Sequence, residues 1–320
     1  MTWWPLIKIL PHKTNLHFVK YSRAAGVISV VLCIASIVAC FYPGLNMGID
    51  FRGGAVMEMT KTDNSALDIG AVREAVGELN LGDVGVQGID SAASAIVRFQ
   101  VPDGEGQSAV VERVQSAISE AVGEVRYSGV SVVGSKVSGE LFTSGLIALG
   151  LAIALMFAYI WFRFEPQFGF GAVAGLLHDV VLTFGLIVLF KLEFSLNMVA
   201  AILTVIGYSM NDTVVVFDRL RENLRKYKSM PLREVIDLSL NETLSRTIIT
   251  GVTAVMVLAA LAIFGGEALF GFSIALMFGI IIGTYSSIYV GAPIILLWGV
   301  KRGELAEDAK PIKLGMASRP

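Results

Sequence analysis

The sequence is poor in charged residues, histidine and cysteine. Asp, Glu, Lys and Arg make up 16% of its 320 residues, whereas soluble chains carry about 25%, so a large water-soluble core is excluded. The three histidines and two cysteines form no cluster with the spacing of a metal site. No nucleophile constellation or phosphate-binding loop is visible either. We therefore predict that the chain is not an enzyme and needs no metal or other cofactor.

Net charge and cysteine spacing exclude two further features. The formal net charge of −2 gives no basis for nucleic-acid binding. Both cysteines, Cys33 and Cys40, fall in the first apolar run. Their separation corresponds to about 10.5 Å along a helix, which is too far for a disulfide. We predict two free thiols within a membrane helix.

Long apolar runs are abundant. Hydrophobic residues make up 54% of the chain, and runs of membrane length, about 20 residues, recur along it. This pattern is typical of a multi-pass α-helical membrane protein. We predict six transmembrane spans, at about 22–42, 141–162, 168–190, 196–217, 247–264 and 270–298.

The distribution of Lys and Arg predicts how these spans are oriented. Four of these residues lie in or directly after the N-terminal segment 1–21, seven lie in the loop 218–246, and five lie in the tail 299–320. The two short loops on the opposite side hold one lysine between them. Because basic loops stay in the cytoplasm, we expect both termini and the basic loop to be cytoplasmic. The bundle of the later spans then occupies 141–298.

The hydrophilic stretch 43–140, between the first and second spans, is expected in the periplasm. It carries seven Lys/Arg against fourteen Asp/Glu. Strands and helices are predicted in the order βαββαβ, at 55–59, 69–79, 83–89, 95–101, 107–122 and 125–133, with Asp68 as the N-cap of the first helix. This order is the ferredoxin-like α+β arrangement, which serves many functions and therefore indicates none.

The fourth predicted span contains an acidic residue, Asp212. An ionisable side chain inside a membrane helix costs about 2.5–3.5 kcal/mol on insertion scales, so it usually faces a protein interior and has a function. Asn211 and Thr213 flank this acid, and Ser209 lies one turn earlier on the same face. We predict that Asp212 handles protons in an energised membrane.

Two other predicted spans carry polar residues. The middle of the third span contains the pair His178–Asp179. The start of the fifth span carries one polar stripe at helical spacing, made of Thr243, Arg246, Thr250 and Thr253. An Asp that faces an Arg across a helix interface acts as a switch, because protonation of the Asp frees the Arg. The alternative is a fixed ion pair that only holds the helices together.

Small residues recur at a spacing of four in two spans. Gly171–Gly175 and Gly279–Gly283 match the small-xxx-small pattern that lets helices approach closely. The pattern alone leaves open whether these faces pack within the chain or against a partner.

Two sequence elements resemble signatures of the SecD/SecF family of bacterial protein-export membrane proteins. The run G-Y-S-M-N-D-T-V-V-V-F-D-R-L-R-E at 207–222 is similar to the fourth-span signature of the SecF members. The segment after the first span is similar to the family's G-x-D-F-x-G-G element and supplies Gly48, Asp50, Phe51, Arg52, Gly53 and Gly54. R-F-E at 163–165, the His-Asp pair and S-R-T-I-I-T at 245–250 also fit the family pattern.

The resemblance implies a half-sized member of the resistance-nodulation-division (RND) superfamily of proton-driven transporters, in which a six-helix half-bundle pairs with SecD. Such complexes use the proton-motive force to promote late steps of preprotein translocation across the bacterial inner membrane. Translocation runs through the SecYEG channel, after SecA has acted. YajC and YidC are further expected partners, and the proton gradient is the energy source.

The resemblance also implies site residues. Asp212 and Arg246 fall on the family's proton path, and we place their polar neighbours in the same path: Asp179, His178, Asn211, Ser209, Thr213 and Thr250. The segment 48–54 would join the periplasmic domain to the membrane. Its two consecutive glycines provide a flexible or tightly turned link, or only a structural turn before a strand.

Two other functions fit parts of the sequence. One is half of a proton-coupled RND-type exporter of small molecules or lipids, although such pumps are usually twice as long and have two external domains. The other is an assembly or sensor subunit that transports nothing, in which the polar residues only hold helices together. A dependence of transport on Asp212 separates the last possibility from the others.

Overall fold

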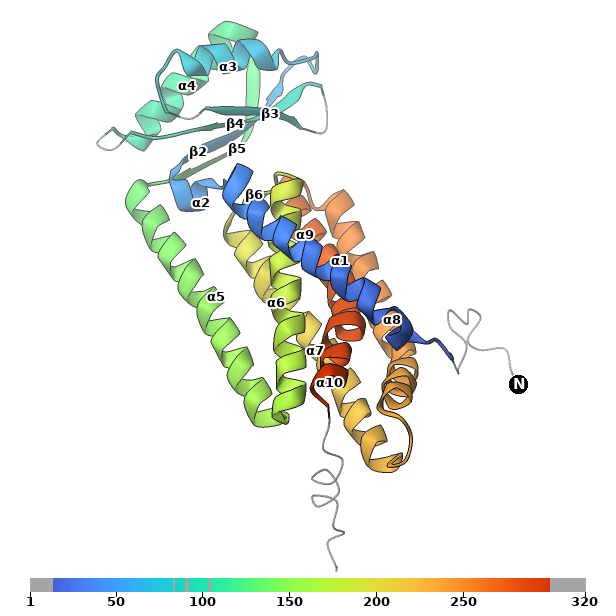
Figure 1. The fold of residues 1–320 in the computed structure, drawn as a ribbon. Coiled ribbons are helices and arrows are strands. Elements are labelled where there is room, and N and C mark those ends of the chain that lie inside the picture. The colour runs from blue at the N-terminus through green and yellow to red at the C-terminus, as the bar shows by residue number, and fades with distance from the viewer. Residues whose placement is uncertain (1–13, 83, 90–91, 103–104, 300–320) are drawn as a thin grey trace, which may run out of the picture.

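The computed structural model describes residues 14–82, 84–89, 92–102 and 105–299, which form a helical bundle and a smaller α+β domain at one end of it (Figure 1). Among the described residues, six helices are long and apolar enough to cross a membrane. The prediction of a six-span membrane protein with one α+β domain is therefore confirmed. Most of the predicted N-terminal segment, and the tail beyond residue 299, lie outside the described residues.

Three helices form the centre of the bundle. Its elements are α1 (Phe18–Ala39), α5 (Ser135–Arg163), α6 (Pro166–Leu189), α7 (Leu196–Lys226), α8 (Leu232–Phe264), α9 (Glu267–Ser286), the π-helical turn η2 (Ser287–Gly291) and α10 (Ala292–Trp298). In the most apolar stretches of α6, α7 and the α9–α10 segment, 61%, 56% and 44% of the residues are buried, against 6% in α1, α5 and α8. The outer helices therefore present apolar side chains away from the protein, as expected in a bilayer.

The predicted loop 218–246 is largely helical. Helix α7 continues to Lys226 and α8 begins at Leu232, so the connection is reduced to residues 227–231. The Leu, Arg, Glu and Lys residues after Phe217 are good helix formers, and Pro231 directly precedes α8, where a proline is tolerated. Charge alone marked this segment as a loop, and it does not exclude a helix that leaves the membrane.

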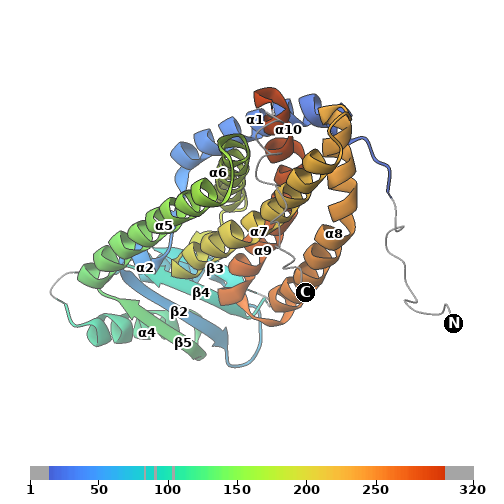
Figure 2. The same ribbon diagram turned by 90° about the horizontal axis from the view of Figure 1, so that it is seen from below.

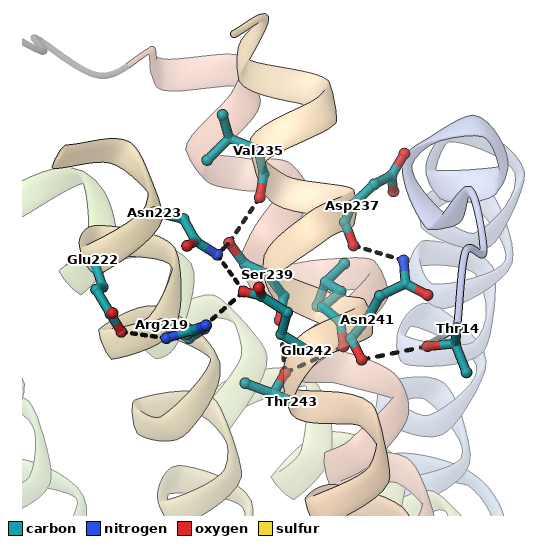
Figure 3. Close-up of polar contacts among 11 residues, drawn as sticks. Thr14, Arg219, Glu222, Asn223, Val235, Asp237, Ser239, Asn241, Glu242 and Thr243 are labelled. Atoms are coloured by element: carbon teal, nitrogen blue, oxygen red, sulfur yellow. Dashed lines mark hydrogen bonds and ion pairs between the residues drawn. The ribbon is translucent and has the colours of Figure 1, made fainter. Parts of the chain in front are cut away.

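Polar contacts hold the end of the α7–α8 hairpin together (Figure 3). The Arg219 Nε–H donates to Glu242 Oε2 at 2.7 Å. The Asn223 amide donates to Ser239 Oγ at 3.0 Å and to Glu242 Oε2 at 2.6 Å. These contacts fix α8 against α7 beyond the apolar part of both helices.

The first described residues, Thr14 and Leu16, are fastened to the same part of α8. The Asn241 side chain accepts a bond from the Leu16 N–H at 2.9 Å and donates to the Leu16 carbonyl at 2.8 Å, and Thr14 donates to the Asn241 carbonyl (Figure 3). No side chain at the N-cap position of α1 caps it. Instead, the Asp237 carboxylate accepts a hydrogen bond from the Val19 N–H at 2.9 Å. The positive end of the helix dipole also stabilises a carboxylate at this position.

The α+β domain has the predicted order of elements: β2 (Gly54–Lys61), α3 (Ile69–Gly77), β3 (Gly85–Ile89), β4 (Ser94–Phe99), α4 (Gln107–Val122) and β5 (Val125–Val133). The antiparallel sheet runs β3-β4-β2-β5. Asp68 caps α3 by accepting from the Gly70 and Ala71 N–H groups, as predicted. Both helices cover the sheet face that points away from the bundle (Figure 1).

A short parallel strand pair joins the two parts. Strand β1 (Asn46–Met47) pairs with β6 (Glu193–Phe194), which lies in the connection between α6 and α7. The four-residue helix α2 (Ile49–Arg52) follows β1 and leads into the sheet. Neither the strand pair nor α2 was predicted, since both depend on segments that are far apart in the sequence.

Both glycine pairs pack within the chain. A Cβ atom at Gly171 would lie 2.7 Å from the Gly291 carbonyl oxygen. A Cβ at Gly279 would overlap the Val205 side chain, and one at Gly283 would lie 3.0 Å from Ser209 Cβ. The absence of side chains therefore lets α9 approach α7, the helix that carries Asp212 (Figure 2).

Gly279→Val is expected to destabilise the bundle by about 1–3 kcal/mol, because the added methyl groups overpack the contact with Val205. Gly150→Val on α5 is the matched control, since nothing lies within 4 Å of a Cβ at Gly150. Thermal unfolding in detergent micelles measures both. Equal midpoints for the two variants would contradict the α7–α9 contact.

Candidate functional site

Helix α7 turns its polar face into the bundle. Ser209, Asp212 and Thr213 are 1%, 8% and 2% exposed. Their spacing places them on one side of the helix, and this side faces α6, α8 and the α9–η2 segment. The prediction that Asp212 has hydroxyl-bearing neighbours on its own helix face is met, but the partner of its carboxylate lies on α8.

The first buried carboxylate is Asp179 on α6, which is fully buried. Its Oδ2 accepts hydrogen bonds from Ser209 Oγ on α7 at 2.5 Å and from Ser286 Oγ on α9 at 2.7 Å. Its Oδ1 lies 2.9 Å from His178 Nδ1. Both oxygens are therefore satisfied, and the side chain ties three helices together.

His178 extends this network towards α1. Its ring stacks on Tyr285 with centroids 5.9 Å apart. The Tyr285 hydroxyl donates to the Ala25 carbonyl at 3.0 Å and lies 3.0 Å from Ser29 Oγ, both on α1. His178 Nε2 is buried and has no partner among the described residues, so this nitrogen is the open end of the network.

The second buried carboxylate, Asp212, is satisfied on one side only. Its Oδ1 accepts a hydrogen bond from Thr247 Oγ1 on α8 at 2.5 Å. Its Oδ2 is buried and has no hydrogen-bond partner among the described residues. A buried acceptor without a donor is costly, and the cost disappears when that oxygen carries a proton or receives a cation.

Three of the predicted site residues make no hydrogen bond or ion pair with this carboxylate in the described part of the chain. Arg246 is exposed, and no ion pair joins it to Asp212 in the described part of the chain. Asn211 is exposed on α7. Thr250 donates to main-chain carbonyls of its own helix. Of the predicted polar stripe on α8, Thr243 is buried and Thr253 bonds back to its own helix.

Three hydroxyl residues of the site were not predicted from the sequence. Thr247 bonds Asp212, Ser286 bonds Asp179, and Ser287 Oγ lies 2.9 Å from Thr213 Oγ1. The signal for Thr247 was its spacing of four residues from Thr243. The signal for the serines was an adjacent polar pair inside an otherwise apolar span.

The 48–54 segment forms a junction at the start of α7. Asp50 Oδ2 accepts a hydrogen bond from the Leu196 N–H, the first residue of α7, at 2.8 Å. Ser195 occupies the N-cap position and makes no side-chain cap bond. Asp50 therefore caps a helix that lies far away in the sequence. Its negative charge interacts favourably with the positive end of the helix dipole.

The other residues of the junction fit their positions closely. The Phe51 ring lies between Phe142 of α5 and Phe194 of β6, with centroids 5.6 and 5.5 Å away. The Gly48 N–H donates to the Phe194 carbonyl at 2.9 Å. A Cβ at Gly48 would lie 2.7 Å from Glu193 Oε1, so glycine is needed where the glutamate lies across the segment.

The two consecutive glycines make a tight turn. Gly53 and Gly54 have φ angles of 75° and 122°, which other residues rarely adopt. A Cβ at Gly54 would lie 2.5 Å from the Phe99 carbonyl oxygen. Arg52 borders a polar cavity of about 340 Å³ beside this turn. The geometry supports the tight turn expected at the entrance to β2.

The side chains at the centre of the bundle are of types that can transfer protons. The described residues contain no group of His, Cys, Asp and Glu side chains that would hold a metal ion. They offer two carboxylates, one imidazole and a set of hydroxyl donors on α6, α7, α8 and the α9–η2 segment. Carboxylates and imidazole inside a membrane bundle are typical of proton relays.

Comparison with known proteins agrees with this architecture. Residues 113–301 match the family described as "Protein export membrane protein SecD/SecF, C-terminal", and residues 41–60 match the "SecD/SecF GG Motif". The chain is 46% identical to the protein translocase subunit SecF of Cereibacter sphaeroides, over 95% of this chain and 96% of that protein. It is 43% identical to the SecF of Rhodobacter capsulatus, over 94% of each.

Two solved structures have the same fold over most of the chain. The crystal structure of SecDF from Thermus thermophilus, a translocon-associated membrane protein, matches with a TM-score of 0.79 and 30% identity. The match covers 90% of this chain and 39% of that one. A crystal structure of SecDF in a super-membrane-facing form matches with a TM-score of 0.62 and 29% identity, over 92% of this chain and 40% of that one. With near-complete matches to SecF proteins and both family regions in order, the chain belongs to the SecD/SecF family of protein-export membrane proteins, as one of its SecF members.

Proposed function

We propose that this protein pairs with SecD and uses the proton-motive force to promote late steps of preprotein translocation through the Sec translocon. The observation that carries the proposal is the half-satisfied carboxylate of Asp212 inside the bundle. An energised membrane supplies about 2.3 kcal/mol per charge for each 100 mV, which is enough to shift a bundle between two arrangements.

Asp212 and Asp179 have different roles in the proposal. Asp179 receives two hydroxyl donors and one imidazole contact, so it is a fixed centre of packing. Asp212 has one donor and one open oxygen. A proton that enters the bundle therefore binds and leaves at Asp212, while Asp179 and His178 hold α6, α7 and the α9 segment in place around it.

In the proposal, Arg246 becomes a partner of Asp212 through a movement of α8. It precedes Thr247 by one residue, which is about 100° around the helix, and its long side chain spans part of that angle. A rotation of α8 brings the guanidinium towards Asp212 Oδ2 when the acid is ionised. Protonation of Asp212 removes this attraction, and α8 returns to the arrangement in which Thr247 is the partner.

The proposed topology puts both termini and the α7–α8 connection in the cytoplasm and the α+β domain in the periplasm. The basic residues around the α7–α8 hairpin support it. In this arrangement the α+β domain stands beside the exit of the SecYEG channel, where a preprotein driven by SecA emerges. YajC and YidC are further proposed partners of the complex.

Asp212→Asn is expected to abolish the stimulation of export by a proton gradient, because the amide cannot exchange a proton. Export into membrane vesicles that contain the variant, SecD and the translocon measures this stimulation with and without an uncoupler. Thr204→Val on the same helix is the control, since Thr204 is exposed and bonds only to its own helix. Full stimulation in Asp212→Asn, with the complex assembled, would point to an assembly role instead.

Asp179→Ala is expected to lower the stability of the bundle by about 1–3 kcal/mol, because it leaves the buried Ser209 hydroxyl and the His178 ring without their partner, although Ser286 keeps the Gly283 carbonyl. Asp212→Ala should cost less, since Thr247 alone loses a partner and its hydroxyl can bond back to its own helix. Thermal unfolding of the purified proteins in detergent compares the two. The division of roles is wrong if Asp212→Ala is the more destabilising change.

A further inference from the structure

The α+β domain is attached to the bundle at three places. Its two ends continue into α1, through η1 (Cys40–Gly44), and into α5. The third attachment is made with the connection between α6 and α7, which is distant in sequence from the domain. This attachment reaches the start of the helix that carries Asp212 further along.

An ion pair crosses from the sheet to that connection. Arg98 Nη2 of β4 lies 2.5 Å from Glu193 Oε2 of β6. Along β4, Ala95, Val97 and Phe99 are buried in the core under α3 and α4. Because side chains alternate along a strand, Arg98 lies on the opposite sheet face, which points to the bundle (Figure 1).

Glu193 is held in place from the other side as well. It lies across Gly48, where any Cβ would crowd its carboxylate. Its strand is paired with β1 through Asn46. Two residues after β6, the Leu196 N–H is bonded to Asp50. The ion pair, the strand pair and the helix cap thus form a continuous path from β4 to the first turn of α7.

We propose that Arg98 and Glu193 are positioning residues of the export reaction, which couple α7 to the α+β domain so that a displacement of α7 on protonation moves the domain. The inference rests on the proposed function of Asp212. Arg98 and Glu193 are 26% and 29% exposed in their side chains. Partly exposed ion pairs contribute little to folding, so this pair can open and close without unfolding either part.

The test compares Arg98→Gln and Glu193→Gln with Arg98→Lys in the vesicle export assay, with SecD and the translocon present. In Arg98→Gln and Glu193→Gln the gradient-dependent stimulation should fall by about fivefold or more, since fivefold is the lower end of typical coupling between sites. Arg98→Lys should retain most of it, because a single nitrogen makes the contact. Arg113→Gln is the matched control, since the Arg113–Glu105 pair lies within the domain.

A second measurement does not depend on transport. Hydrogen exchange of the amides at 193–198, in the purified complex with SecD, should be faster in Arg98→Gln than in Arg113→Gln. Full stimulation in Arg98→Gln and in Glu193→Gln, together with its loss in Asp212→Asn, would overturn the coupling and leave the proposed function intact. If Asp212→Asn also keeps stimulation, the proposed function fails, and exchange at 193–198 then decides: unchanged exchange overturns the contact, and faster exchange supports it.

Discussion

A carboxylate buried among apolar helices needs hydrogen-bond donors for its oxygens, and this requirement organises the centre of the bundle. Asp179 receives such donors from Ser209 on α7 and Ser286 on α9. The donors reach it only because α9 and α7 lie close together, which depends on the missing side chains of Gly279 and Gly283. The acid, the hydroxyls and the glycines therefore form one interdependent set.

Asp212 differs from Asp179 in how far this requirement is met. One of its oxygens is bonded to Thr247 and the other has no donor among the described residues. A fully satisfied carboxylate stabilises one arrangement of helices, whereas a half-satisfied one costs free energy unless it is protonated or paired. In our proposal this contrast makes Asp179 the structural acid and Asp212 the exchanging acid.

Much of this architecture could be predicted from the sequence, because it depends on local patterns. Run length predicted six spans, alternation and helical spacing predicted the βαββαβ domain, and Asp68 was identified as a helix cap. The inward orientation of Asp212 followed from the cost of exposing an acid to lipid.

Contacts between distant segments could not be predicted in the same way. Helical spacing indicated a polar stripe on α8, but a rotation of one residue decides whether Arg246 or Thr247 meets Asp212, and only the packing of α8 on α7 fixes that rotation. The bonds from Asp50 to Leu196 and from Arg98 to Glu193 join segments whose sequences carry no sign of each other. The bond between Asp50 and Leu196 explains the 48–54 segment better than backbone flexibility does.

The central claim is that Asp212 exchanges a proton while Asp179 does not. Infrared difference spectroscopy of the purified complex in lipid, recorded across a pH titration, reports the carboxyl stretch of each protonated acid. Single Asp212→Asn and Asp179→Asn variants assign the bands. We expect one titrating band, which disappears in Asp212→Asn and persists in Asp179→Asn. A titrating band that disappears only in Asp179→Asn would contradict the claim.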